Sequence, residues 1–249
     1  MCLILVAWRV HADFPLVVAA NRDEFYARPT LPAGHWPDAP QVIAGRDLEA
    51  GGTWLGITES GRFAAVTNVR EPGAPQGRRS RGDLTRHFLT SAAAPLQAAQ
   101  AIDGADYSGF NLLLAAGDNL CYLSNRDSQP RLLAPGIYGV SNHLLDTPWP
   151  KLASAKTRFA EALAHLPAAA PFFAILADDE IVPDAVLPST GVPLEWERLL
   201  SAVFVKSETY GTRASTLLTV ARDGAIRLEE RSYGQAGKPL QSSVISTGV

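Results

Sequence analysis

Two apolar segments lie close together near residue 1, CLILVAW at residues 2–8 and LVVAA at residues 16–20. The residues between them at 11–15 have turn character, so the pattern predicts a β-hairpin. Both segments are almost continuously apolar rather than alternating, which is typical of strands that are covered on both faces. Residue 2 is therefore expected in the middle layers of the protein and not on a frayed end.

The rest of the chain predicts further strands and helices in separate blocks. Residues 21–40 are polar and contain four prolines, which favours an ordered loop without regular structure. Strands are expected at 53–58, 62–69, 110–116, 120–124, 136–141, 215–221, 226–231 and 243–247. Helices are expected from residues 83, 95 and 150, and at 172–178 and 195–202. Because short turns join neighbouring strands, the order predicts antiparallel sheets covered by helices, an α+β layered fold. No repeat or linker divides the chain, so residues 1–249 are expected to form a single domain.

Composition excludes several classes of protein. The chain has 22 Lys and Arg against 25 Asp and Glu, a formal net charge of −3, which gives no reason to expect nucleic-acid binding. Hydrophobic residues make up 47% and charged residues 19%, as in globular proteins. Two cysteines allow no disulfide framework and no cysteine-based zinc site, which favours a cytoplasmic location. No apolar run is long enough for a membrane span. Four arginines within residues 70–81 are expected on a solvated loop rather than at a phosphate site.

Cys2 is the residue with the clearest chemical potential. Removal of Met1 would leave a cysteine that carries both a thiol nucleophile and a free α-amine. The amine titrates near 7.7–8.0 and the thiol near 8.5, so the amine is able to accept the thiol proton at neutral pH. The simpler alternative is a buried hydrophobic cysteine in a strand.

A polar cluster, Asn21-Arg22-Asp23-Glu24, follows the second predicted strand. The hairpin would bring this cluster back beside residue 2, where the Asp23 carboxylate could orient an N-terminal amine. Asn21, Arg22 and Glu24 are expected to contact substrate. The structural alternative is an ordinary polar segment after a strand, with Arg22 and Glu24 paired to each other.

Several motifs together resemble the NRDE family, which is the family of transport and Golgi organisation protein 2. They are MCLI at residues 1–4, NRDE at 21–24, GTWLG at 52–56, TN at 67–68, SN at 141–142, LDTPWPK at 145–151 and YGTR at 210–213. That family in turn resembles N-terminal nucleophile hydrolases of the choloylglycine hydrolase and acylase type. The resemblance implies a four-layer αββα sandwich with two antiparallel sheets between helices.

The resemblance also implies a catalytic set. Cys2 matches the nucleophile, Asp23 the acid that holds the amine, and Arg213 an arginine near the nucleophile. Asn68 and Asn142 match polar groups near the oxyanion, where amide donors at about 2.7–3.1 Å are worth a few kcal/mol. One position departs from the pattern, because those hydrolases carry an arginine where this chain has Ala20. The implied activity is hydrolysis of a linear amide, a non-peptide C–N bond, with no cofactor required.

Alternatives remain open for each of these residues. Without the resemblance, Asn68 is expected to cap a strand end, Asn142 to form an Asx turn and Arg213 to pair with Glu208. The family is also linked to haem trafficking, so a second hypothesis is a non-catalytic carrier of haem or an acyl lipid. The five histidines show no metal-ligand spacing, and His143 is expected on a turn. A small-molecule ligand or substrate is expected under either hypothesis, and the sequence predicts no oligomeric state.

Overall fold

A computed structural model describes residues 2–127 and 129–248 and shows two antiparallel sheets. The first sheet has six strands in the order β10-β1-β2-β11-β12-β13. Its strands are β1 (Cys2–Trp8), β2 (Leu16–Phe25), β10 (Gly136–Val140), β11 (Tyr210–Val220), β12 (Ile226–Tyr233) and β13 (Pro239–Thr247). β1 and β2 form the predicted hairpin in the middle of this sheet, with Cys2 opposite Arg22 and Trp8 opposite Leu16.

The second sheet has seven strands in the sequential order β3 to β9. They are β3 (Thr30–Trp36), β4 (Ala39–Asp47), β5 (Leu55–Thr58), β6 (Phe63–Asn68), β7 (Phe110–Ala116), β8 (Asn119–Ser124) and β9 (Arg131–Leu133). Every neighbouring pair is antiparallel. This sheet is therefore a meander, as the predicted short turns require.

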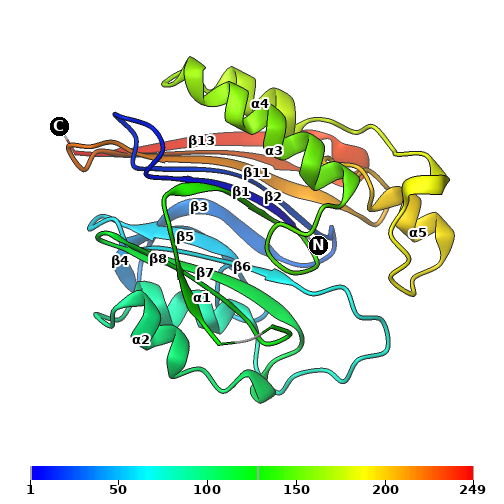
Figure 1. Cartoon of the computed structure of the whole chain (residues 1–249), viewed down its shortest axis with the longest axis horizontal. Helices are drawn as coiled ribbons and strands as arrows, with labels where there is room; N and C mark the ends of the chain where they lie inside the picture. Colours follow the sequence, from blue (N-terminus) through cyan, green and yellow to red (C-terminus); the bar gives the residue numbers. More distant parts are fainter. Residues whose placement is uncertain (1, 128, 249) are drawn as a thin grey trace.

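Helices cover the outer faces of both sheets, and one short helix lies beyond the ends of the strands (Figure 1). The α-helices are α1 (Gly82–Leu89), α2 (Pro95–Gln100), α3 (Pro150–Ala162), α4 (Ala170–Leu176) and α5 (Leu194–Leu199). Short 3-10 turns are η1 (Gly104–Asp106), η2 (Leu163–His165), η3 (Asp184–Val186) and η4 (Gln235–Gly237). Pro95 and Pro150 stand at the first helical positions, where a missing N–H group costs nothing.

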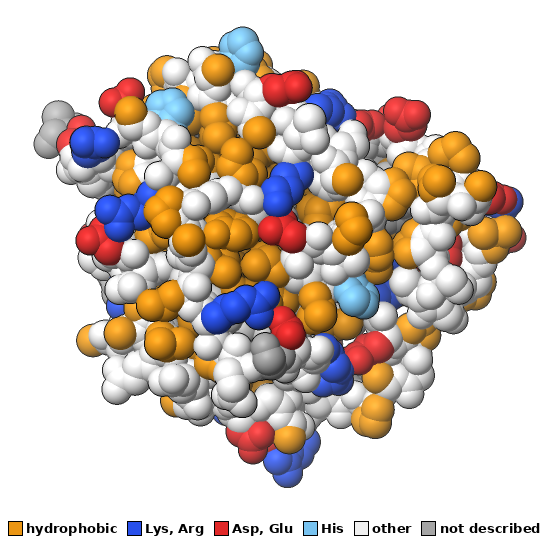
Figure 2. Space-filling view, viewed as in Figure 1, with side chains coloured by type: hydrophobic (Ala, Val, Ile, Leu, Met, Phe, Trp, Pro, Cys, Tyr) orange, Lys and Arg blue, Asp and Glu red, His pale blue; other side chains and the backbone are white. Residues whose placement is uncertain are grey.

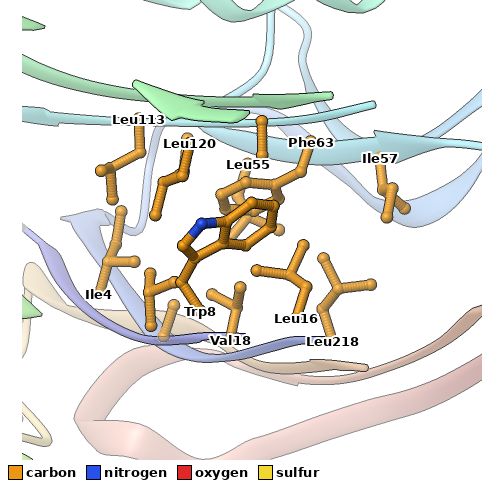
Figure 3. Packing of buried hydrophobic residues seen from close by; sticks show 14 of the residues in the cluster. Ile4, Trp8, Leu16, Val18, Leu55, Ile57, Phe63, Leu113, Leu120 and Leu218 are labelled. Carbon is orange, nitrogen blue, oxygen red and sulfur yellow. The ribbon is translucent and has the colours of Figure 1, made fainter. Parts of the chain in front are cut away.

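Three apolar cores hold the layers together. One lies between the sheets, where Trp8 packs against Leu55, Phe63 and Leu113 of the opposite sheet (Figure 3). A second core joins α3 and α4 to the six-stranded sheet, and a third joins α1 and α2 to the seven-stranded sheet. The result is the expected αββα sandwich. None of its described helices is both long and apolar enough to span a membrane.

Strand β1 is buried along its whole length, as its continuous apolar sequence predicts. Alternate side chains point to opposite faces of a strand. Ile4, Val6 and Trp8 accordingly enter the core between the sheets, whereas Leu3 and Leu5 enter the core under α3 and α4. Cys2 has the parity of Ile4, so its thiol faces the space between the two sheets.

The prediction of a loop at residues 21–40 is wrong. β2 continues to Phe25, and residues 30–36 and 39–47 form β3 and β4. β3 is an edge strand of the seven-stranded sheet, and its pairing with β4 is irregular after Leu31, next to Pro32. Proline is tolerated in such a position because an edge strand has one side that needs no ladder hydrogen bonds.

The expectation of a solvated loop at residues 70–81 is also only partly correct. The segment has no helix or strand, but the Arg70 side chain is buried in an ion pair with Glu197 of α5, with Arg70 Nη1 2.7 Å from Glu197 Oε2. Arg81 lines a cleft that is described below. On the face shown in Figure 2, basic and acidic side chains are intermixed, in keeping with the small net charge.

Candidate active site

Cys2 begins β1 at the end of the six-stranded sheet and is 8% exposed. The ladder places Cys2 directly opposite Arg22 of β2, and Ser141 Oγ donates a 3.0 Å hydrogen bond to the Cys2 carbonyl oxygen. The residue therefore has a fixed backbone on both sides. Its side chain lines a cleft of about 690 Å³ between the ends of the two sheets.

The cleft is lined mainly by polar and charged side chains. Those named in the sequence analysis are Cys2, Arg22, Asp23, Glu24, Asn68 and Arg213. Further charged members are Arg28, Arg46, Asp47, Glu49, Arg78, Arg79, Arg81 and Glu230, and apolar members include Leu31, Trp54 and Val66. A polar ligand with a short apolar portion fits such a lining best.

Burial controls the ionisation of the thiol. Loss of solvent is the largest effect and raises the pKa of Cys2, the charge of Asp23 also raises it, and the positive charge of Arg22 across the ladder acts in the opposite direction. The pKa of Cys2 therefore lies above its ordinary value, and the guanidinium group limits that rise. An apolar residue opposite Cys2 would leave the thiol protonated over a wider pH range.

Asp23 is fixed by β11. Its Oδ1 atom accepts a 2.7 Å hydrogen bond from Thr212 Oγ1, and its carbonyl oxygen accepts one of 3.2 Å from the Tyr210 hydroxyl. Burial raises the pKa of Asp23, whereas the charge of Lys151 and the bond from Thr212 lower it. The carboxyl group thus lies in a buried polar setting built by three separate segments of the chain.

Lys151 is a functional candidate that the sequence analysis missed. It is 5% exposed in the first turn of α3, and its Nζ atom donates a 2.8 Å hydrogen bond to the Leu200 carbonyl oxygen. Burial lowers the pKa of Lys151 to about 8, and the Asp23 charge opposes that change. The motif LDTPWPK contains this lysine, but only the fold shows that its ammonium group is buried near Asp23.

Asn68 and Asn142 are brought together as predicted from the resemblance. Asn142 Nδ2 donates to Asn68 Oδ1 at 2.9 Å, and Asn142 has no exposed surface. Asn68 lines the cleft and Asn142 lies behind it. The pair connects β6 to the segment after β10, and the Asn68 Nδ2 atom donates to the Val69 carbonyl oxygen at 3.3 Å.

Arg213 lies in the cleft wall at an irregularity of β11, between Thr212 and Ala214. Its Nη1 atom donates to the carbonyl oxygens of Phe25 at 2.9 Å, Tyr26 at 3.2 Å and Arg28 at 2.9 Å. The alternative of a pair with Glu208 is wrong, because these carbonyls are its hydrogen-bond acceptors. Arg213 therefore fixes the turn that follows β2.

Three residues of the NRDE cluster, Arg22, Asp23 and Glu24, line the cleft, and Asn21 does not. Arg22 Nη2 is 3.8 Å from Glu24 Oε2 and 3.5 Å from Asp47 Oδ2. The Asn21 Nδ2 atom donates to the carbonyl oxygens of Leu176 at 2.8 Å and Val203 at 2.9 Å. Asn21 thereby fastens the sheet to the helical layer, because alternation turns it away from Cys2.

Ala20 has no exposed surface and packs in the core between the sheets. Ala20 lies two residues before Arg22 in β2, so the two side chains point to the same face of the strand. The arginine that the related hydrolases carry at this position is therefore absent. Arg22, opposite Cys2, supplies a guanidinium group beside the thiol instead.

The glycine of the motif GTWLG allows two backbone segments to cross at the cleft edge. A Cβ atom on Gly52 would lie 2.4 Å from the carbonyl oxygen of Gly82. Thr85 of α1 reinforces the crossing, because its Oγ1 atom donates to the carbonyl oxygens of Thr53 at 2.5 Å and Gly82 at 2.9 Å. This crossing places the start of α1, and Arg81 immediately before it, on the cleft wall.

Residues 2–127 and 129–248 contain no cluster of three or more His, Cys, Asp or Glu side chains arranged to hold a metal ion. His143 lies on a turn, where its Nδ1 atom is 3.0 Å from Thr147 Oγ1, and it does not line the cleft. The described cleft contains no histidine. The chemistry available there is that of a thiol, carboxylates, amides and guanidinium groups.

Comparisons with a family model and with known sequences agree on one family. The family model described as "Transport and Golgi organisation 2" matches residues 1–235. A transport and Golgi organization protein 2 homolog from Bos taurus is 41% identical over 241 residues, covering 88% of this chain and 87% of that protein. The homolog from Homo sapiens is 38% identical over 239 residues, with the same coverage.

Comparison with solved structures identifies the fold. A Caenorhabditis elegans ortholog of N-acylethanolamine-hydrolyzing acid amidase superposes with a TM-score of 0.55 at 14% identity, covering 87% of this chain and 92% of that one. The C2A mutant of a conjugated bile acid hydrolase from Clostridium perfringens superposes with a TM-score of 0.52 at 9% identity, covering 99% and 92%. Both are N-terminal nucleophile hydrolases, so the sandwich described above is the fold of that class.

Proposed function

This chain belongs to the transport and Golgi organisation 2 family and has the N-terminal nucleophile hydrolase fold, and on that basis we propose that it is a cysteine amidohydrolase. The proposed substrate is a linear amide, and the proposed nucleophile is Cys2 after removal of Met1. The observation that carries the proposal is the position of Cys2. Its thiol lies at the start of a central strand, opens into the cleft and has Arg22 directly opposite.

The proposed reaction has two stages. The α-amine of Cys2 accepts the thiol proton, and the thiolate attacks the carbonyl carbon of the amide. Collapse of the tetrahedral intermediate breaks the C–N bond, and the ammonium returns the proton to the departing amine, leaving a thioester on Cys2. Water then attacks the thioester with the amine as base, which releases a carboxylic acid and restores the thiol. No cofactor is needed for this sequence.

The surrounding residues have distinct proposed roles. Asp23 holds the α-ammonium in place, and Thr212 and Tyr210 fix Asp23. Asn68, oriented by Asn142, faces the oxygen on which negative charge develops. Arg213 acts at a distance by holding the turn after β2, and is thus a positioning residue.

Turnover and the state of the N-terminus test this proposal together. Purified protein of confirmed mass is incubated with N-octanoylglycine and N-octanoylethanolamine, and released octanoate is measured. Cys2→Ala is expected to abolish release. Protein from a host with inhibited methionine aminopeptidase keeps Met1 and every side chain, and is expected to be slower by about 10²–10⁴-fold because the free amine is missing. Unchanged release in either preparation would overturn the proposal.

A second candidate function is transport of haem or an acyl lipid without catalysis, and Ala20 is the observation that favours it. The cleft itself favours the hydrolase, because its lining is highly charged and includes no histidine as an axial ligand. Titration with haem, followed at the Soret band, separates the two. A saturable change at micromolar haem that is lost in Cys2→Ala would support the carrier.

A further inference from the structure

The wall of the cleft is rich in arginine, and several of these arginines are neutralised by carboxylates. Its described lining contains seven arginines and five carboxylate side chains. Arg28 pairs with Asp47 at 2.5 Å, Arg46 pairs with Asp38 at 2.5 Å, and Arg78 pairs with Asp106. Two arginines close to Cys2, Arg22 and Arg81, have fewer hydrogen-bond and ion-pair partners.

Arg81 approaches the cleft from the layer that contains α1. Among the described residues it forms no ion pair, and its one hydrogen bond runs from Nη1 to the Gly109 carbonyl oxygen at 3.2 Å. Burial lowers the pKa of Arg81, and the charges of Cys2 and Glu24 oppose that change, so the group lies within electrostatic range of the thiol. A guanidinium group stays protonated in proteins, which leaves a half-buried cation facing the cleft.

Arg22 approaches the same space from the opposite wall. Its side chain is 9% exposed, and its Nη1 atom is buried without a hydrogen-bond partner among the described residues. Glu24 and Asp47 lie on the Nη2 side at 3.8 and 3.5 Å, and the charges of Glu230 and Asp23 also lie within electrostatic range of Arg22. An unsatisfied buried donor is costly, so this atom is a place where a ligand oxygen gains free energy on binding.

We propose that Arg22 and Arg81 form a subsite for a carboxylate on the amine side of the substrate, which makes the substrate class an N-acyl amino acid. The inference rests on the proposed function, since it takes Cys2 as the point of amide attack. Arginine favours carboxylates because its N–H groups match their two oxygens. In an N-acyl amino acid the carboxylate carbon is only two bonds from the amide nitrogen. A carboxylate held beside Cys2 would therefore keep the scissile bond within reach of the thiol.

The carboxylates of the cleft limit how such a ligand is placed. Asp47 is neutralised by Arg28 at 2.5 Å, and Glu24 faces Arg22 Nη2. The ligand carboxylate is thus expected between Arg22 Nη1 and Arg81, away from Glu24. The apolar side chains of Leu31, Trp54 and Val66 remain available for the acyl chain.

Binding to a catalytically dead protein tests the subsite without requiring turnover. In a Cys2→Ala background, calorimetry compares N-octanoylglycine with N-octanoylethanolamine, which share the amide and the acyl chain but differ in the carboxylate. The glycine compound is expected to bind at least about 10-fold more tightly, the gain of one charge-assisted contact. Adding Arg81→Gln is expected to reduce the difference to less than about twofold, with the ethanolamine compound unaffected.

Arg86→Gln is the matched control, because Arg86 lies five residues after Arg81 and carries the same charge, but it pairs with Asp83 at 3.0 Å and does not line the cleft. It is expected to leave the preference unchanged. Equal binding of the two compounds, an unchanged preference in Arg81→Gln, or no binding of either compound would each overturn the subsite. Failure of wild-type turnover alongside a preference that depends on Arg81 would overturn the hydrolase and leave the subsite standing.

Discussion

Lys151 is the residue whose ionisation the interior changes most clearly. Its ammonium group is almost fully buried, is held by the carbonyl oxygen of Leu200 at 2.8 Å and has a pKa lowered to about 8 by burial. The ordinary value of 10.5 applies to the unfolded chain. Between these two values the unfolded state binds more protons, so this residue makes stability rise as the pH rises.

The pH dependence of unfolding checks this behaviour against Lys151→Met. The free energy of unfolding of the wild type, relative to the variant, is expected to increase by about 3 kcal/mol from pH 7 to pH 10.5. Urea denaturation at several pH values measures the difference, and titrating groups that do not interact with Lys151 cancel in the comparison. A difference that is flat over this range would show that the lysine is not buried as described.

At the residue scale the sequence predicted which side chains lie near one another better than it predicted which way each one points. Cys2, Asp23 and Asn68 meet at one cleft because the hairpin of β1 and β2 and the end of β6 converge there. The prediction that Asn21 contacts substrate is wrong, because four consecutive polar residues do not show which side chains of a strand face the cleft. Lys151 was overlooked because its burial depends on the packing of α3 against residues far along the chain.

At the scale of elements, a buried ion pair joins the segment after β6 to α5. Arg70 Nη1 lies 2.7 Å from Glu197 Oε2, and Glu197 Oε1 accepts hydrogen bonds from both N and Oγ1 of Thr190. The Arg70 guanidinium also stacks 4.8 Å from the Trp149 ring centroid. This network fixes the segment after β6 against α5.

Removal of one partner is expected to be costly because it leaves a buried charge. Glu197→Ala should lower the free energy of unfolding by about 3–5 kcal/mol. Asp184→Ala, which breaks the exposed pair between α5 and η3, should change the free energy of unfolding far less, because solvent screens that pair. Urea denaturation of both variants checks the contrast, and similar effects in the two would contradict it.

Elements with strong local patterns were predictable, and those defined by partners were not. The hairpins of β1 with β2 and of β7 with β8 follow from apolar runs and turn residues that the chain carries locally. β3 was missed because Pro32 is tolerated only in an edge strand, and the position of β3 at an edge is a property of the sheet. The four-layer arrangement came from the resemblance, since periodicity alone predicts only antiparallel sheets with covering helices.

At the scale of the whole molecule, the six-stranded sheet combines three distant parts of the chain. β1 and β2 lie in its middle, with β10 on one side and β11 to β13 on the other. The core between the sheets draws on both sheets at once (Figure 3). No cut along the sequence therefore divides the molecule into two halves that each keep a complete core.

Unfolding is accordingly expected to be one cooperative transition. Tryptophan fluorescence and far-ultraviolet circular dichroism should give the same urea midpoint, because Trp8 lies in the core between the sheets. A control series at several protein concentrations separates unfolding from dissociation. Two separate transitions would contradict the single domain proposed for residues 1–249.

The central claim is that Cys2 is an accessible N-terminal nucleophile, and intact mass measured before and after brief treatment with limiting iodoacetamide tests it most directly. Cys121 is the internal control, because it is 1% exposed and burial raises its pKa to about 11. The account predicts a mass lacking one methionine and a single rapid modification that maps to Cys2. Retention of Met1, or a Cys2 as slow to react as Cys121, would contradict it.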